Sequence, residues 1–206
     1  MSTDPAQAVA DFDSAVQYVD GLLATAPESA GGGLESLADF GSYEGTPAQI
    51  ELDDNGRSAR LLRAITYHSP QGTDWPVPVD AWLDGASIPR AFWTIIGGPF
   101  EGKYRAASIV HDHYCITKTR TWRDTHRMFH DAMRCSDVAK AQATVMYYAV
   151  YRFGPRWSDP GLEAMATRAE ATSDANAASF AQDARRIVLE GLGPEAAAAL
   201  ADSHRA

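Results

Sequence analysis

The sequence predicts an α+β protein in which a small antiparallel β-sheet, a hairpin plus an edge strand, packs on an α-helical bundle. Two observations carry this prediction. Polar and apolar residues alternate from about residue 48, around a turn at Asn55-Gly56, and three later segments between residues 104 and 153 have helical spacing of apolar residues. Because the strand signals precede the helix signals instead of alternating with them, the α+β class is favoured.

The amino-terminal region predicts an additional amphipathic helix over residues 5–25. Asp4 and Pro5 suit a helix start, since aspartate accepts hydrogen bonds from free amides and proline fits the first turn. The glycine-rich stretch that follows is typical of a linker. We therefore expect residues 1–33 to form an acidic helix and linker, which either packs on the core or serves a partner.

Residues 48–68 predict a β-hairpin, with a return strand from about Ala59 to His68. A further strand is predicted from Trp75 to Trp82. Its prolines cannot donate to a strand ladder, so this strand is expected at a sheet edge.

After residue 90 the pattern becomes helical. A short helix is predicted at 91–97, and longer helices are predicted at residues 104–117, 120–135 and 137–153. Ser136-Asp137 is expected to cap the third long helix and Gly154 to end it. We expect a core domain over residues 45–157 and an Ala-rich helical tail over 158–206.

The net charge of −9 is unevenly distributed. Residues 1–56 hold eleven acidic residues and no Lys or Arg, residues 57–160 carry a net charge of +5, and residues 161–206 carry −3. A basic middle region suits an anionic substrate or partner. No recognised nucleic-acid module accompanies it, so nucleic-acid binding by the basic helices is a third alternative only.

The sequence predicts a cytoplasmic protein. No stretch approaches the ~20 apolar residues of a membrane span, and the amino terminus lacks the basic start and apolar run of a secretory signal. The two cysteines, Cys115 and Cys135, fit a reducing compartment. Signal-independent export or association with a virion stays open as an alternative.

Histidines are concentrated in two neighbouring predicted helices. His111 and Asp112 lie in the first, and His126 and His130 lie in the second, with residues 118–121 between the helices. Antiparallel packing would bring His111, Asp112 and His126 together. Imidazole and carboxylate groups are ligands of zinc and manganese, and a coordinated water becomes a nucleophile near neutral pH. These three residues therefore predict a divalent-metal site, with zinc or manganese as the ion.

Two other interpretations of the histidines stay open. In one, His111 is a hydrogen-bonded core residue while His113 and His130 face solvent. In the other, the histidines perform acid–base chemistry without a metal. If the imidazoles of His111 and His126 lay further than ~6–7 Å apart, they could not share one zinc ion.

Residues 84–90, Asp-Gly-Ala-Ser-Ile-Pro-Arg, form a second candidate site. The small residues let the backbone approach a ligand, while Asp84 offers a carboxylate, Ser87 a hydroxyl and Arg90 an anion-binding guanidinium. Alternatively, Asp84 and Ser87 cap a helix that begins at Pro89. Ser87 does not stand in a Gly-x-Ser-x-Gly elbow, so a serine nucleophile is not expected.

Taken in order, several motifs resemble a domain family of unknown function that is found mainly in bacteriophages and prophages. They are Val77-Pro78, the 84–90 segment, Phe92-Trp93, and His111-Asp112 with Tyr114. Three residues before Phe129 the family typically has aspartate, whereas this chain has His126. Since aspartate and histidine exchange as metal ligands, the departure favours the predicted polar site. The resemblance implies a phage-type context and leaves the reaction open.

We expect first a metal-assisted hydrolase that acts on an anionic substrate of the cell-wall or phosphoester class. Its catalytic residues would be Asp84, His111, Asp112 and His126, and its substrate-binding residues would be Ser87, Arg90, Tyr114 and Arg123. The alternative is a non-enzymatic, phage-derived structural or interaction protein. It would dock a partner through its acidic amino-terminal helix and use the same polar residues as a buried network.

Overall fold

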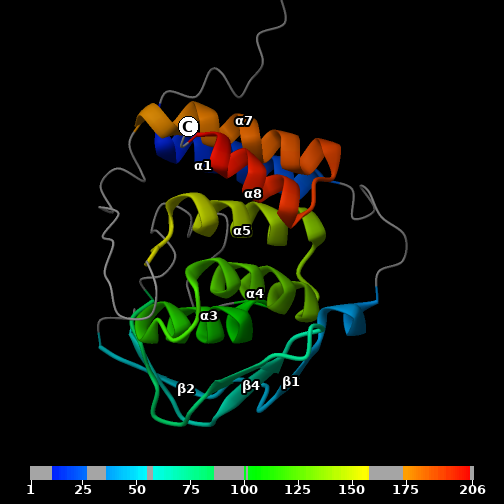
Figure 1. Ribbon diagram of the computed structural model, residues 1–206. Coiled ribbons are helices and arrows are strands. Elements are labelled where there is room, and N and C mark those ends of the chain that lie inside the picture. Colours follow the sequence, from blue (N-terminus) through cyan, green and yellow to red (C-terminus); the bar gives the residue numbers. More distant parts are fainter. Residues whose placement is uncertain are drawn as a thin grey trace, which may run out of the picture.

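The protein is built in layers, with two small sheets at one end and helices stacked above them (Figure 1). The computed structural model describes residues 11–26, 36–54, 58–85, 100, 102–157 and 174–204. The predicted α+β class is confirmed. The expected turn at Asn55-Gly56 and the short helix at 91–97 lie outside the described residues.

Two three-stranded antiparallel sheets take the place of the single predicted sheet. One has the strand order β1-β4-β5 and the other β2-β3-β6. The strands are β1 (Ser42–Glu44), β2 (Ile50–Leu52), β3 (Ala59–Leu61), β4 (Ile65–His68), β5 (Asp74–Val77) and β6 (Trp82–Leu83).

The predicted return strand and edge strand are each divided between the two sheets. Residues 59–68 form β3 and β4, and residues 75–82 contribute to β5 and β6. One physical reason is local: Asp80 has a φ of 63° and donates its backbone N–H to the carbonyl of Leu61 at 2.8 Å. A residue in the left-handed region breaks an extended strand. β5 and β6 both lie at sheet edges, so the predicted edge position is confirmed.

The helices of the central region were predicted correctly, within a few residues at their ends. The helical elements are α1 (Phe12–Thr25), the 3-10 turn η2 (Leu37–Phe40), α3 (Arg105–Thr117), α4 (Trp122–Cys135), α5 (Lys140–Phe153), α7 (Asp174–Glu190) and α8 (Pro194–Ser203). α1 begins at Phe12, because Asp11 is its N-cap and accepts the N–H of Ser14 at 2.7 Å. The predicted helix start at Asp4 and Pro5 lies outside the described residues.

Of the two predicted caps of α5, one is wrong and one is confirmed. Ser136 ends α4, and Ala139 precedes α5 without a side-chain cap. Asp137 is instead paired with Lys103. Gly154 does end α5, donating its N–H to Val150 at 2.8 Å. A Cβ at this position would lie 2.4 Å from the same carbonyl oxygen, so only glycine fits.

The helices follow one another away from the sheets. α3 contacts β4, β5 and β6; α4 packs on α3, α5 on α4, and α7 and α8 on α5. α1 packs against α7 and buries Phe12, whose ring stacks on that of Phe180 at 5.5 Å between centroids. The amino-terminal helix therefore packs its apolar face on the carboxy-terminal helix α7.

None of the helices in the described part of the chain has both the length and the apolar character needed to cross a bilayer.

Candidate functional site

The central feature of the site is a direct contact between two buried imidazoles, one from α3 and one from α4. His111 Nε2 and His126 Nδ1 lie 2.8 Å apart, and both side chains are fully buried. The short connection makes the two helices adjacent: Lys118 takes a left-handed conformation after α3, and Thr121 caps α4. The two histidines are thus well within the distance at which one metal ion could bind both.

Hydrogen bonding assigns the proton positions in this pair. His126 Nε2 lies 3.1 Å from the carbonyl oxygen of Pro155, which can only accept, so Nε2 carries a proton. In a neutral His126 ring, Nδ1 then accepts a hydrogen bond from the Nε2–H of His111. Burial lowers the pKa of His111 well below its usual value, and the neighbouring His126 lowers it further. An imidazole fixed by a backbone carbonyl through one nitrogen is typical of metal-binding histidines.

The thiol of Cys115 is the third donor, one helical turn after His111. Its Sγ lies 3.6 Å from His111 Nε2, and ligand atoms of His111, Cys115 and His126 all lie within 4.8 Å of one another. Burial raises the pKa of this thiol, and the nearby Asp112 and Asp84 raise it further. A bound cation would have to displace the thiol proton. Sequence reasoning missed Cys115, although its four-residue spacing from His111 places both on one helix face.

Asp112 points to the backbone of residues 84–85 and is not part of this three-donor group. Its Oδ2 accepts the N–H of Asp84 at 2.9 Å and that of Gly85 at 3.2 Å. Gly85 has a φ of 60°, a conformation that favours glycine. Asp112 therefore holds the end of the β6 segment against α3, and it brings Asp84 close to the three donors.

The predicted substrate-binding residues are dispersed. Tyr114 donates its hydroxyl to the carbonyl of Pro76 at 3.2 Å and packs on Trp75, which links α3 to β5. Arg123 is exposed and stacks over Trp122, at 4.3 Å from the ring centroid. Trp122 in turn meets the ring of His126 edge-on. Ser87 and Arg90 lie outside the described residues.

The other two histidines of the cluster do not join the group. His113 is half-buried beside the ring of Tyr114. His130 is buried, in contrast to the solvent-facing position that one interpretation expected. Its Nδ1 lies 2.9 Å from Asp131 and its Nε2 lies 3.5 Å from the Thr144 hydroxyl. A carboxylate and a hydroxyl satisfy this ring at the boundary between α4 and α5.

Comparisons with known proteins identify the region that contains the site. Residues 59–150 match the model of a family described as protein of unknown function (DUF1353). The match includes all three donors, together with Asp84 and Asp112. The predicted resemblance to a domain family of unknown function is confirmed at this level.

Two proteins of Sinorhizobium fredii are similar to the chain, and both are described as uncharacterized. The protein y4jT is 46% identical over 120 residues, which cover 58% of this chain and 36% of y4jT. The protein y4iH is 37% identical over 124 residues, which cover 60% of this chain and 52% of y4iH. The chain thus spans a third to a half of these relatives. No solved structure matches it.

Proposed function

We propose that His111, Cys115 and His126 bind a divalent metal ion and that the protein is a metal-assisted hydrolase of the phage or mobile-element type. The observation that carries this proposal is the convergence of two imidazole nitrogens and one sulfur within 4.8 Å. Three protein ligands with an open fourth position are typical of catalytic zinc sites.

The donor atoms favour zinc over manganese. A thiolate is a soft ligand that suits zinc, whereas manganese prefers oxygen donors. Two ligands at about 2.1 Å in tetrahedral geometry are about 3.3–3.4 Å apart, which is wider than the 2.8 Å between the imidazole nitrogens. Binding of zinc therefore requires the two imidazole rings to move apart by about half an ångström, which breaks the hydrogen bond between them.

The surroundings suit hydrolysis of an anionic substrate. Zinc would lower the pKa of a bound water toward ~7 and supply the nucleophile. Asp84 is close enough to Cys115 to raise the pKa of its thiol, and we assign it the role of general base. The net charge of +5 over residues 57–160 would attract a cell-wall or phosphoester substrate.

A metal-content measurement with matched cysteine variants tests the proposal. Purified protein should hold close to one zinc by elemental analysis. Zinc at about a hundred times its dissociation constant should raise the melting temperature of the chelator-treated protein by roughly 5–10 °C. Cys115→Ser should weaken zinc binding by at least about tenfold. Cys135→Ser should bind as the wild type, since Cys135 is only half-buried and lies outside the donor group.

Histidine variants separate a catalytic from a structural role. His126→Asp should retain a metal with a preference shifted toward manganese, because a carboxylate is a harder ligand. His126→Ala should lose both metal and hydrolysis while circular dichroism remains helical. The absence of stoichiometric metal in the wild type, together with no thermal shift on adding zinc or manganese, would contradict the proposal.

The burial of the group favours a second candidate, a non-enzymatic structural or interaction protein. In this case the imidazole pair and the bonds from Asp112 to residues 84–85 serve only to fix the sheets against α3. Docking through the amino-terminal helix would have to use its exposed acidic face, since its apolar face packs on α7. Under this proposal His126→Ala unfolds the protein, and the wild type itself has no hydrolytic activity.

A further inference from the structure

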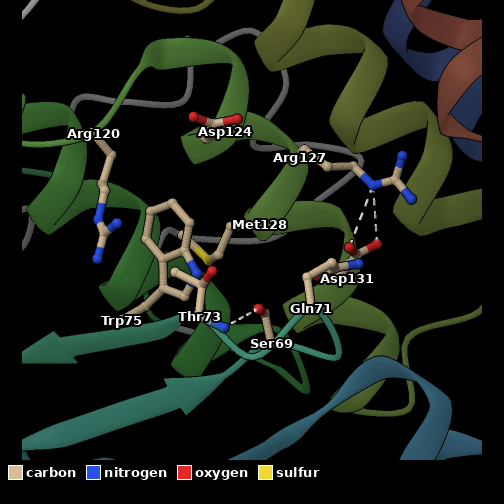
Figure 2. Close-up of a pocket in the computed structure, with 9 residues that line it drawn as sticks. All are labelled: Ser69, Gln71, Thr73, Trp75, Arg120, Asp124, Arg127, Met128 and Asp131. Atoms are coloured by element: carbon tan, nitrogen blue, oxygen red, sulfur yellow. Dashed lines mark hydrogen bonds and ion pairs between the residues drawn. The ribbon is translucent and has the colours of Figure 1, made fainter.

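A pocket lies between the β4–β5 connection and α4, with the side chains of Figure 2 around it. Its volume is about 440 Å³, within the range of small-molecule sites. The lining residues are Ser69, Gln71, Thr73, Trp75, Arg120, Asp124, Arg127, Met128 and Asp131. On α4 these residues recur every three or four positions, on the face opposite His126 and Phe129. The pocket is therefore separate from the three-donor group.

Trp75 contributes a hydrogen-bond donor that no described residue accepts. Its side chain is 4% exposed, and Nε1 is buried without an acceptor among the described residues. An unsatisfied buried donor costs about 1–3 kcal/mol and calls for an explanation. In Figure 2 the ring edge that carries Nε1 is turned toward Thr73 and Met128, inside the pocket. A ligand with an acceptor atom would satisfy it.

Arg120 places a cationic group next to this donor. Its guanidinium lies over the Trp75 ring, 5.3 Å from the centroid, and reaches the carbonyl of Asp74 only at 3.4 Å. Arg120 forms no ion pair with the described residues. A guanidinium fork binds a carboxylate through two parallel hydrogen bonds, and the indole N–H can supply a third. These two side chains are arranged to receive a carboxylate.

Asp124 provides the matching negative charge. It is exposed, and its Oδ2 accepts the Thr121 hydroxyl at 2.7 Å, while Oδ1 bonds to no described residue. The other charged residues are already paired: Arg127 with Asp131 and with Glu195. Of the pocket's described charged residues, Arg120 and Asp124 thus remain for a ligand. Arg120 directly precedes Thr121, the N-cap of α4, and Asp124 lies in the first turn of this helix.

We propose that this pocket binds a small zwitterion of the amino-acid or dipeptide class. Its carboxylate is bound by Arg120 and the Trp75 indole N–H, and its ammonium group by Asp124. Ser69, Gln71 and Thr73 contact the rest of the molecule with hydroxyl and amide groups. Because Nε1 is covered in the empty pocket, Met128, which is unbranched and flexible, moves aside on binding. This inference does not depend on the proposed metal chemistry.

Nuclear magnetic resonance of the full chain tests the assignment, because the indole N–H of Trp75 gives its own signal. The probes are L-alanine, L-glutamate and glycylglycine, with propionate and propylamine as analogues that carry a single charge. At about 10 mM, above the usual range of metabolite affinities, at least one zwitterion should shift the Trp75 signal. Propionate and propylamine should bind at least about tenfold more weakly.

Variants then assign each contact. Arg120→Gln, Asp124→Asn and Trp75→Phe should each weaken binding of that zwitterion by at least about tenfold, measured by calorimetry. Arg186→Gln is the matched control, since Arg186 is exposed on α7, pairs with Glu190 and does not line the pocket. All four variants should keep the metal content of the wild type. The proposal is overturned if no probe moves the Trp75 signal, if propionate binds as well as the zwitterion, or if binding survives Arg120→Gln or Asp124→Asn.

Discussion

The two faces of α4 carry opposite kinds of chemistry. One face holds His126, Phe129 and Met133, all with no measurable exposure, and packs against α3. The other face holds Asp124 and Arg127, which border an open pocket. In the buried interface, desolvation lowers the pKa of His111, whose ring is hydrogen-bonded to His126. On the pocket face, Asp124 is exposed and Arg127 is paired with Asp131 and Glu195.

The two proposed sites therefore lie on opposite sides of one helix. On the buried side, His126 joins His111 and Cys115 of α3 in the proposed metal site. On the pocket side, Asp124 is the charged residue proposed to bind the ammonium group of a zwitterion. Variants on the two faces should therefore differ in their effects on stability and on ligand binding.

Phe129→Ala should have the largest effect. The ring is fully buried and stacks on His111, with 4.5 Å between centroids. Its removal leaves a cavity and should cost about 3–5 kcal/mol in the free energy of unfolding. The melting temperature should fall by roughly 10 °C, as measured by calorimetry. Gln71→Ala, an exposed change on the pocket side, should alter stability by less than about 0.5 kcal/mol. If the two variants changed the free energy of unfolding equally, the proposed contrast between the buried face and the pocket side would be contradicted.

Asp131→Asn and Asp124→Asn should differ although both residues line the pocket. Asp131 is buried and accepts hydrogen bonds from both Arg127 and His130, so its neutralisation should cost about 1–3 kcal/mol. Asp124 is exposed in the first turn of α4, and its neutralisation should cost only about 0.5 kcal/mol. Urea unfolding measures both values. If Asp124→Asn lost more free energy of unfolding than Asp131→Asn, the structural role assigned to Asp131 would be contradicted.

His68 directly precedes the pocket residue Ser69 and should have the smallest effect on stability. Its pKa is shifted in the direction opposite to that of His111. The hydrogen bond that the His68 Nδ1–H donates to Asp74 raises the pKa of His68, whereas burial lowers that of His111. The pairing of His68 therefore stabilises the folded protein below the unfolded pKa of about 6.5 and is lost as pH rises through the folded value. Titration of the imidazole by magnetic resonance should give a lower pKa in Asp74→Asn. An unchanged value would contradict the pairing.

Local patterns were sufficient to predict most of the helical fold. Apolar spacing predicts α3, α4 and α5, and Gly154 ends α5 for a steric reason that depends only on the adjacent turn. The strand assignments were less complete. Residues 59–68 were predicted as one return strand, yet they are divided between two sheets. Strand pairing depends on distant partners, which periodicity alone does not specify.

The short connection between the two predicted helices was the basis for expecting His111 and His126 to lie close together, since four residues leave little choice of packing. Which side chains complete the group depends on contacts between distant segments. The tertiary structure turns Asp112 toward residues 84–85 and places Cys115 beside the imidazoles. Within the described part of the chain, it also leaves the Trp75 indole nitrogen without an acceptor, at a pocket that no motif indicated. Hydrogen-bond partners and cavities arise from elements far apart in the chain, so spacing along one helix cannot specify them.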